Sequence, residues 1–379
     1  MDRTTAESGV SGRALVSGDL AFSVATREDD ADIRRLLREN ALGGWVRLAL
    51  EREPDAFAAD FGLGRSHAFI VARERTTGEA VGICEQSVRD AFIDGEIRQL
   101  PYLGSLRVAP SYRRRIRVLR GGFAAVRALL GNRAALPYAL TAITADNHAA
   151  QRVLCAGLPG LPRYRPAGML STFALRTAIT AVPSEVEPAT SADLPAIAVL
   201  LQRAYRRFQF APVWRAADIA RLLATGGLRI DDFLVVRRGP GLRGCLAVWD
   251  QSIARQTVVR DYVPWLGRLR PLINLAAPLA SLPRLPAPGS TLAQVYLSHV
   301  AVEDDDPAVF RALLAAGSTL ARKRGFEIAL IGFAAGHPFA AVVARARPIT
   351  YRSLLYLVHW PDAELAISDR LAHPEIALL

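Results

Sequence analysis

Residues 106–130 read LRVAPSYRRRIRVLRGGFAAVRALL and pass from a strand, through a run of arginines, into a helix. Amides in the first turn of a helix have no acceptor within the helix, and the helix dipole is positive there, so such a turn suits a phosphate group. Arginine side chains add charge-assisted hydrogen bonds. The arginines of this turn are Arg113, Arg114, Arg115, Arg117 and Arg120. The stretch therefore predicts a turn that binds a polyphosphate.

The stretch resembles the phosphate-binding loop of the Gcn5-related N-acetyltransferase (GNAT) superfamily. In that superfamily a strand ending in V-x-P leads through an aromatic residue and an R-x-x-G-x-G/A loop, which binds the pyrophosphate of coenzyme A, into a helix. A later strand ends at an Asn that opens a second helix. The matching residues here are Val108, Pro110, Tyr112, Arg113 and, after the strand YALTAITA, Asn147. The resemblance covers most of residues 20–176, and the same plan recurs more weakly over residues 185–360.

The glycines of this loop depart from the family pattern. With Arg113 as the leading arginine, the two glycine positions hold Ile116 and Val118, whose side chains obstruct close approach of backbone to phosphate. With Arg117 leading, only the final glycine position is matched, by Gly121–Gly122. We interpret the stretch as a modified phosphate loop that uses both glycines. The alternative is a solvated arginine surface in which the glycines allow close packing of the helix.

The opening of the first half recurs later in the chain. The segments ATREDDADIRRLL, from Ala25, and ATSADLPAIAVLL, from Ala189, match at a constant offset of 164 residues. In each, apolar residues at i, i+3 and i+4 predict an amphipathic helix with a threonine or aspartate available to cap its start. Three further pairs follow in the same order: the strands before Gly82 and Gly244, then YLGSLRV with VYLSHVAV, then YALTAITADNHAA with FEIALIGFAAGHPFA. Four matches in one order predict a tandem repeat.

These patterns predict a mixed α/β (α+β) fold made of two tandem GNAT-like domains, each a mixed, mostly antiparallel sheet flanked by helices. We expect a flexible N-terminal tail over residues 1–19, a donor-binding domain over 20–180 and a degenerate second domain over 185–379. The linker RTAITAVPSEVEP is short and partly apolar, unlike a Gly/Ser tether. The two halves are therefore expected to pack as one rigid body around a shared cleft.

Residues 251–293 break the repeat with an insertion rich in Pro, Leu and Arg. Its prolines predict a loop rather than a continuous helix; they are Pro264, Pro271, Pro278, Pro283 and Pro286. We expect a lid whose apolar residues line a pocket beside the donor site. Those residues are Trp265, Leu266, Leu269 and Leu272. Packing between the two halves and a surface patch for an anionic membrane are the alternatives.

The second half carries an acidic loop where the first half carries arginines. Its sequence is VEDDDPAVF, and Asp304, Asp305 and Asp306 would repel a pyrophosphate, although carboxylates suit the start of a helix. We expect that the second half does not bind coenzyme A there. It is either structural or supplies part of the acceptor pocket.

Acyl transfer to an amine requires a hydrogen-bond donor for the thioester carbonyl, a base for the amine proton and an acid for the thiolate. The resemblance implies that a backbone amide around Leu106 to Val108 meets the carbonyl. It also implies a tyrosine acid seven residues after the turn Asn, but that position holds Leu154. The acid is therefore missing from its usual place. The nearest substitutes are Tyr102 and Tyr164, and Glu96 is the candidate base, acting through water.

Composition limits the class of protein. The chain has 379 residues and a formal net charge of +11, carried almost wholly by arginine because Lys323 is its single lysine. This balance favours anionic ligands without choosing among phosphate, nucleic acid and anionic lipid. Cys84, Cys155 and Cys245 form no CxxC pair, and no histidines are paired at metal-ligand spacing, so we expect neither a metal nor a disulfide framework. No apolar segment has the length of a signal-peptide core or a bilayer span, so we expect a cytoplasmic protein with no transmembrane segment.

The resemblance implies an acyl-CoA-dependent N-acyltransferase, most simply an N-acetyltransferase, with acetyl-CoA or another acyl-CoA as co-substrate. The expected acceptor is an amine of a small molecule or a peptide, and the expected assembly is a monomer or homodimer. Two alternatives stay open. One is a non-catalytic binder or sensor of acyl-CoA, which the lost glycines and tyrosine favour. The other is a transferase that takes its acyl group from an acyl carrier protein or an aminoacyl-tRNA; nucleic acid is otherwise not an expected partner.

Overall fold

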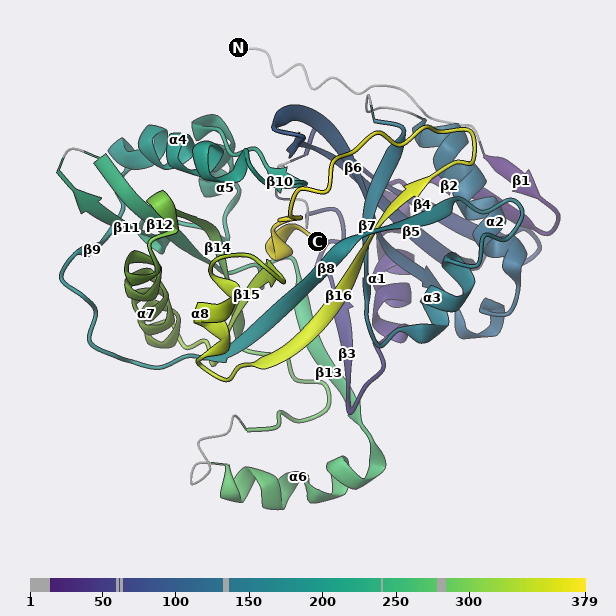
Figure 1. Cartoon of the computed structure of the whole chain (residues 1–379). Coiled ribbons are helices and arrows are strands. Elements are labelled where there is room, and N and C mark those ends of the chain that lie inside the picture. Colours follow the sequence, from purple (N-terminus) through teal and green to yellow (C-terminus); the bar gives the residue numbers. More distant parts are fainter. Residues whose placement is uncertain (1–13, 59–60, 62–63, 132–135, 240, 278–283) are drawn as a thin grey trace, which may run out of the picture.

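A computed structural model describes residues 14–379 apart from 59–60, 62–63, 132–135, 240 and 278–283. In the described part of the chain, fourteen strands form one continuous sheet and two more form a separate ribbon (Figure 1). The order of the large sheet is β1-β2-β4-β5-β6-β7-β16-β8-β15-β14-β12-β11-β9, with β10 paired to β5. Most neighbours are antiparallel, and the parallel pairs are β6 with β7 and β14 with β15.

The described residues of the first half form eight strands and three α-helices. The strands are β1 (Leu15–Ser17), β2 (Leu20–Val24), β3 (Val46–Glu51), β4 (Ser66–Glu74), β5 (Ala80–Ile93), β6 (Glu96–Val108), β7 (Tyr138–Thr144) and β8 (Arg163–Arg176). The helices are α1 (Asp30–Glu39), α2 (Ile116–Ala125) and α3 (His148–Leu154). Part of the segment expected to be a flexible tail is thus ordered, because β1 pairs with β2; residues 1–13 lie outside the described residues.

The second half contains eight strands and five α-helices among its described residues. The strands are β9 (Val186–Pro188), β10 (Ala211–Pro212), β11 (Phe233–Arg238), β12 (Gly241–Trp249), β13 (Gln256–Tyr262), β14 (Gln294–Val302), β15 (Ile328–Ala334) and β16 (Ile349–His359). The helices are α4 (Leu194–Tyr205), α5 (Ala216–Thr225), α6 (Pro264–Ala276), α7 (Pro307–Lys323) and α8 (Ala340–Ala344).

The starts of α1 and α4 show the repeat in atomic detail. The Thr26 amide donates to Asp29 Oδ2 at 2.7 Å, and the Thr190 amide donates to Asp193 Oδ2 at 2.8 Å. Each aspartate also pairs with an arginine from the neighbouring strand, Asp29 with Arg73 and Asp193 with Arg237. These carboxylates satisfy backbone donors that a helix start leaves free. The prediction of two tandem mixed domains is confirmed.

The two halves exchange strands at the centre of the sheet. β8, from the first half, pairs antiparallel with β15 of the second half. β16, from the second half, lies between β7 and β8 and pairs with both. Figure 1 shows β8 and β16 crossing together from one half to the other. The sheet is therefore continuous across the whole molecule, which the repeat pattern alone did not predict.

Helices cover both faces of the second half. Strand alternation directs Cys245, Ala247 and Trp249 into a core shared with α4 and α5. It directs Leu246 and Val248 into a second core under α7. Both faces of β12 are therefore buried, which explains why its sequence is an almost unbroken apolar run.

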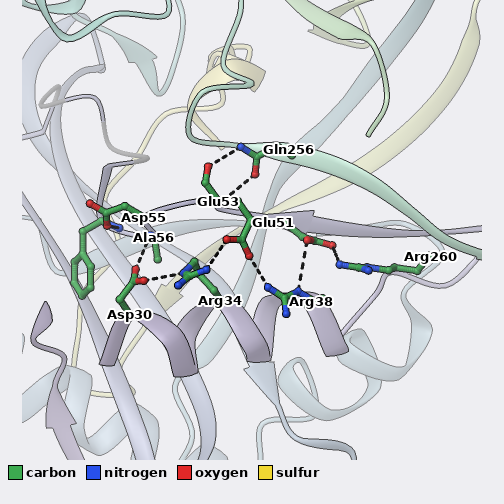
Figure 2. A network of polar contacts seen from close by, with 10 residues as sticks. Asp30, Arg34, Arg38, Glu51, Glu53, Asp55, Ala56, Gln256 and Arg260 are labelled. Atoms are coloured by element: carbon green, nitrogen blue, oxygen red, sulfur yellow. Dashed lines mark hydrogen bonds and ion pairs between the residues drawn. The ribbon is translucent and has the colours of Figure 1, made fainter. Parts of the chain in front are cut away.

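A two-stranded ribbon of β3 and β13 leaves the first half beside α1. Its base is held by a polar network between α1 and the end of β3 (Figure 2). Arg34 of α1 bonds Asp30 at 2.7 Å and Glu53 at 2.5 Å, and Arg38 bonds Glu53 at 2.6 Å. The Gln256 side chain accepts from the Glu53 amide and donates to the Glu53 carbonyl, both at 2.8 Å. The network fixes the direction in which the ribbon leaves the body.

The insertion forms a helix, which corrects the prediction of a proline-shaped loop. Pro264 occupies the first turn of α6, where its missing N–H is not needed. Pro271 lies inside α6 on its exposed side and removes one intrahelical hydrogen bond without ending the helix. Pro286 follows the helix, whereas Pro278 and Pro283 lie outside the described residues. In the described residues no helix is both long and apolar enough to cross a membrane.

Candidate active site

The arginine stretch forms the turn that joins β6 to α2. A short 3-10 helix, Pro110–Tyr112, follows β6, and α2 begins at Ile116 with no capping side chain and no acidic residue in its first turn. All of its arginines are exposed: Arg113, Arg114, Arg115, Arg117 and Arg120. The start of α2 therefore presents uncapped backbone amides within a ring of positive charge, as the phosphate interpretation requires.

Neighbouring residues hold several of these guanidinium groups in place. Arg113 donates to Asn40 Oδ1 at 3.0 Å, and Arg120 donates to the carbonyl of Pro159 at 2.9 Å. Arg117 lies 3.0 Å from Asp19 Oδ2, and Arg115 lies 3.7 Å from the same oxygen. One carboxylate thus faces several arginines, so the turn keeps a surplus of positive charge.

The glycine pair lies beyond the first turn of α2, where its amides are part of the helix. A Cβ on Gly121 would lie 2.2 Å from the ring of Phe22, which is fully buried. Gly121 is therefore required for close packing of the helix on β2, and its assignment to phosphate binding is corrected. A Cβ on Gly122 would have no other atom within 4 Å, and this glycine borders a pocket under α2. Neither glycine reaches the turn itself.

A β-bulge interrupts β6 at Ser105, whose φ of 48° lies in the left-handed region. The pairing of β5 with β6 shifts register at this point. On its other side β6 pairs with β7 only at Tyr102 and Leu140, so the described parts of the two strands separate beyond Tyr102. Leu106 and Val108 follow the bulge at this opening, where the resemblance implies an amide that meets a carbonyl.

An apolar pocket lies beneath α2 and reaches this opening. Its free space, counted together with the open solvent at its mouth, is about 340 Å³. Its walls come from β2, β4, β5, β6 and α2 and include Phe22, Ile70, Cys84, Leu106, Val108, Leu119, Gly122 and Phe123. The pocket joins the separated end of β6 to the inner side of the arginine-bearing helix.

A buried carboxylate, Glu85, lies on the opposite face of the sheet beside the bulge. Its oxygens accept hydrogen bonds from Arg52 at 2.5 Å and from the Ser105 hydroxyl at 2.7 Å, and His67 Nε2 lies 2.6 Å away. Burial alone would raise the pKa of Glu85, but the charge of Arg52 and the hydrogen bond from His67 hold it well below its usual range. Glu85 is therefore an ionised group in direct contact with the bulge residue.

Tyr102 lies next to Glu85, whereas the other two predicted catalytic residues do not. Both side chains border Gly104: a Cβ placed on this glycine would lie 2.9 Å from the Tyr102 ring and 3.8 Å from Glu85 Oε2. Burial and the nearby charge of Glu85 raise the pKa of Tyr102 to about 12. Tyr164 is a packing residue between Phe123 and Tyr356, with ring centroids 6.5 Å and 5.8 Å away.

Glu96 lies at an exposed hairpin end, 67% exposed, and pairs with Arg206 at 3.3 Å. It is held at the surface because the Asp94–Gly95 turn directs it away from the sheet. Its assignment as the base is therefore wrong.

Asn147 has the predicted position between β7 and α3. Its Oδ1 accepts a hydrogen bond from the Ala150 amide at 3.1 Å and so caps α3. The cap fixes where α3 starts beyond β7. Leu154, at the place of the family tyrosine, is buried in the core of the first half.

A second pocket opens to solvent beside Tyr102 where the two halves meet. Arg89, Phe210, Glu375 and residues 378–379 line it with Tyr102. Glu375 accepts hydrogen bonds from Trp214 Nε1 at 3.0 Å and the His299 amide at 2.6 Å. Burial raises the pKa of Glu375 to about 7 in spite of these bonds. This pocket lies between the two halves, where the repeat predicts a shared cleft.

Sequence reasoning missed Glu85, His67, Ser105 and Glu375. The available signal for Glu85 was a charged residue inside the apolar strand AVGICEQS, where an unpaired carboxylate is costly. Ser105 and Glu375 carried no comparable signal, because neither a bulge nor a contact across the two halves can be read from local pattern.

The loop before α7, which matches the arginine turn in the repeat, is acidic in the described part of the second half. Before α7, Arg243 bonds Glu303 at 2.6 Å and Arg207 bonds Asp305, while Asp306 caps the helix through the Ala308 amide. These carboxylates fill the helix start that the first half leaves uncapped. Among the described residues, no three His, Cys, Asp or Glu side chains lie close enough to hold a metal ion.

Comparison with known proteins identifies the fold. No protein-family model and no curated sequence matches the chain. N-myristoyltransferase of Saccharomyces cerevisiae, in a structure with bound myristoyl-CoA and inhibitors, has a TM-score of 0.62 at 10% identity, over 96% of this chain and 87% of that one. A GCN5-related N-acetyltransferase from Sphaerobacter thermophilus has a TM-score of 0.55 at 13% identity, over 93% of this chain and 100% of that one.

A third structure, the GCN5-related glucosamine N-acetyltransferase region of a fungal multi-domain β-N-acetylglucosaminidase, has a TM-score of 0.57 at 11% identity, over 92% of this chain and 39% of that one. Each match spans both halves of the chain. The protein therefore has the fold shared by N-myristoyltransferase and the GCN5-related N-acetyltransferases.

Proposed function

We propose that the protein is an acyl-CoA-dependent N-acyltransferase. The observation that carries the proposal is that three features adjoin one another: the arginine turn at the start of α2, the apolar pocket under α2, and the strand residues Leu106 to Val108 that follow the bulge at Ser105. A polyphosphate, an apolar chain and a reacting carbonyl need these three environments in this order. The shared fold supports the proposal, because its neighbours are N-acyltransferases.

The donor would bind in the first half only. Its diphosphate would accept from the first-turn amides of α2 and from Arg113, Arg115 and Arg117, whereas Asp305 and Asp306 would repel it in the second half. The separated ends of β6 and β7 would leave backbone amides around Leu106 to Val108 for the thioester carbonyl.

The chemistry requires the acceptor ammonium to lose one proton before it attacks. The amine nitrogen then bonds to the carbonyl carbon, the C–S bond breaks, and the second amine proton goes to the leaving thiolate. Glu85 is the group we assign to the first proton, because it is ionised and bonded to the bulge residue Ser105. Its low pKa makes this transfer uphill.

The acceptor would enter through the second pocket, beside Tyr102 and Glu375. Its position opposite the donor pocket lets an amine approach the carbonyl from the other face of the sheet. A peptide amine is the acceptor class we favour, since the pocket lies between the halves and is lined by apolar residues together with Arg89 and Glu375.

The pocket under α2 favours an acyl group longer than acetyl. Its described walls are almost wholly apolar, with Arg107 the sole charged residue among them. Apolar surface removed from water contributes about 0.8 kcal/mol per methylene. Affinity should therefore rise with chain length until the pocket is full.

Calorimetric titration with coenzyme A, acetyl-CoA, octanoyl-CoA and myristoyl-CoA tests the donor site without knowledge of the acceptor. We expect one site per chain and affinity that increases with chain length. Arg113→Ala with Arg115→Ala should weaken all four ligands, by about 1.5 to 3 kcal/mol for each lost charged hydrogen bond. Gly122→Leu should weaken the binding of the long-chain ligands alone. A Cβ at this position meets no other atom, so the leucine side chain can occupy the pocket without a clash.

Arg322→Ala, on the exposed end of α7, is the matched control and should bind as the parent does. Two equal sites, or binding that is independent of the arginines, would contradict the proposal. If an acyl carrier protein or an aminoacyl-tRNA binds with the same affinity as acyl-CoA, the donor belongs to one of those other classes.

A non-catalytic acyl-CoA binder is the second candidate, favoured by Leu154 at the place of the family tyrosine. It predicts the same titrations but no release of coenzyme A thiol when amines are added. Thiol release measured with a panel of N-terminal peptides separates the two.

A further inference from the structure

We propose that the outer face of α6, with Trp45 beside it, docks on the surface of an anionic lipid bilayer. The outer face consists of residues exposed on one side of the helix: Trp265, Leu269, Leu272 and Leu275, at 51%, 44%, 64% and 78% exposure. The inference stands apart from the proposed transferase activity, because it uses no residue of either pocket.

The opposite side of α6 is the side that folds the helix onto the ribbon. Leu266 and Ile273 pack with Tyr262 and Val259 of β13, and Arg270 and Asn274 bond the carbonyl of Leu285 at 3.0 Å and 2.9 Å. The leucines of the outer face take no part in this core. Large apolar side chains gathered in this way on an exposed surface mark an interaction site.

Two tryptophans meet at one end of the face. Trp45, at the start of the ribbon, is 71% exposed, and its ring lies 5.8 Å from that of Trp265 in an edge-to-face contact. They come from segments more than two hundred residues apart, so the fold brings them together. Tryptophan is enriched where hydrocarbon meets polar headgroups, because its ring is apolar and its N–H needs a polar partner.

The charge around the face selects an anionic partner. From Tyr262 to Val302 the sequence contains no Asp or Glu. Arg268 and Arg284 are exposed within this run, and Arg47 is exposed on the adjoining strand β3. A helix with leucine and tryptophan on one side and arginine at its margin is typical of interfacial membrane binding. A second copy would bring the same positive charge to the contact, in a protein whose net charge is already +11.

The placement of α6 allows it to reach a flat surface. Figure 1 shows α6 standing apart from both halves at the end of the β3–β13 ribbon. The network around Glu53 holds the base of that ribbon against α1, as Figure 2 shows. A fixed, projecting apolar face can contact a bilayer without rearrangement of the sheet.

Co-sedimentation of the full chain with sucrose-loaded vesicles tests the proposal. We expect binding to phosphatidylcholine vesicles that contain 30% phosphatidylglycerol, at least tenfold weaker binding to phosphatidylcholine alone, and a further loss in high salt. The triple variant L269S/L272S/L275S should bind at least tenfold less, and R47Q/R268Q/R284Q should bind the anionic vesicles as weakly as neutral ones. Tryptophan emission should shift to the blue on binding, and W45F/W265F should abolish the shift.

Val199, Ile179 and Ile349 are equally exposed apolar residues elsewhere, at 66%, 68% and 66%. Their replacement by serine gives the matched control, which should bind vesicles like the parent. Unchanged melting temperatures confirm that all variants fold. Binding that the leucine variant retains overturns the proposal. So does a parent dimer in light scattering that the same variant converts to monomer, since the face would then belong to a second copy.

Discussion

Ser105 and His299 occupy the same place in the two repeats, and each lies at a bulge with a left-handed backbone, at φ of 48° and 51°. Each also contacts a buried carboxylate. The Ser105 hydroxyl donates to Glu85, and the His299 amide donates to Glu375. Both halves therefore share the bulge, but its acidic partner comes from β5 in the first half and from the C-terminal segment after β16 in the second, and a basic turn lies beside the bulge of the first half.

Glu85→Gln should lower the rate of acyl transfer by about 100- to 10,000-fold, the range for loss of a general base. Donor affinity should stay within twofold, because Glu85 lies on the face opposite the donor pocket. Glu96→Gln is the control, and its rate should be that of the parent. A rate for Glu85→Gln equal to the parent's would remove Glu85 from the mechanism.

Adjacent glycines of α2 should respond in opposite ways to alanine. Gly121→Ala should lower the free energy of unfolding by about 1 to 3 kcal/mol, because its Cβ would overlap the buried Phe22 ring. Gly122→Ala should raise it by up to about 1 kcal/mol, since its Cβ meets open space and alanine favours helix. Urea denaturation of both variants measures the difference. Equal effects would show that packing on Phe22 is not what selects glycine at position 121.

Glu375 should make the parent less stable as pH rises. Its pKa is raised to about 7 in the folded protein from 4.5, so its contribution is fully present below pH 4.5 and is lost as pH rises through 7. The difference in unfolding free energy between parent and Glu375→Gln should therefore fall by about 3 kcal/mol from pH 4.5 to pH 8. Burial lowers the pKa values of His299 and His373, so their contributions to stability run in the opposite direction and are present in both proteins. A difference that does not change with pH would contradict the assignment.

The two halves should stay associated after the linker between them is cleaved. The Ala178 amide donates to Ser318 Oγ at 3.1 Å, and the Thr180 amide donates to Thr319 Oγ1 at 3.1 Å. A protease site inserted after Ser184 should be cleaved with little loss of stability, and both fragments should elute together in gel filtration because β8 and β16 remain interleaved. Two separate peaks under native conditions would be incompatible with this packing.

Local pattern was sufficient for much of the fold. Thr26 with Asp29, Thr190 with Asp193, and the helix caps at Asn147 and Asp306 are short-range features, and they lie where their spacing indicates. The exchange of β8 and β16 was not predictable, because strand order depends on pairings between residues far apart in sequence. The α6 prediction was wrong because proline was counted as a breaker at a position, the first turn, where it is favourable.

The site was predicted less well than the fold. The arginine turn could be found in the sequence because its arginines are close together in the chain. Gly121 was misassigned because helix packing and phosphate binding both select glycine. Glu96 and Tyr164 were chosen by their position in sequence, and the fold directs one to solvent and the other into the core. Glu85 and His67 meet across two strands, so their contact has no trace in either segment alone.

The interleaving of β8 with β16 also determines when, during translation, the strands of the sheet can pair. During synthesis β7 emerges at residue 144, but its partner β16 is complete only at residue 359. For more than two hundred residues of translation the first half carries an open sheet edge, and β8 waits for β15 in the same way. The pairing of β7 and β8 is thus completed by the last strand of the second half, so a chain released early exposes unpaired strand edges that favour aggregation.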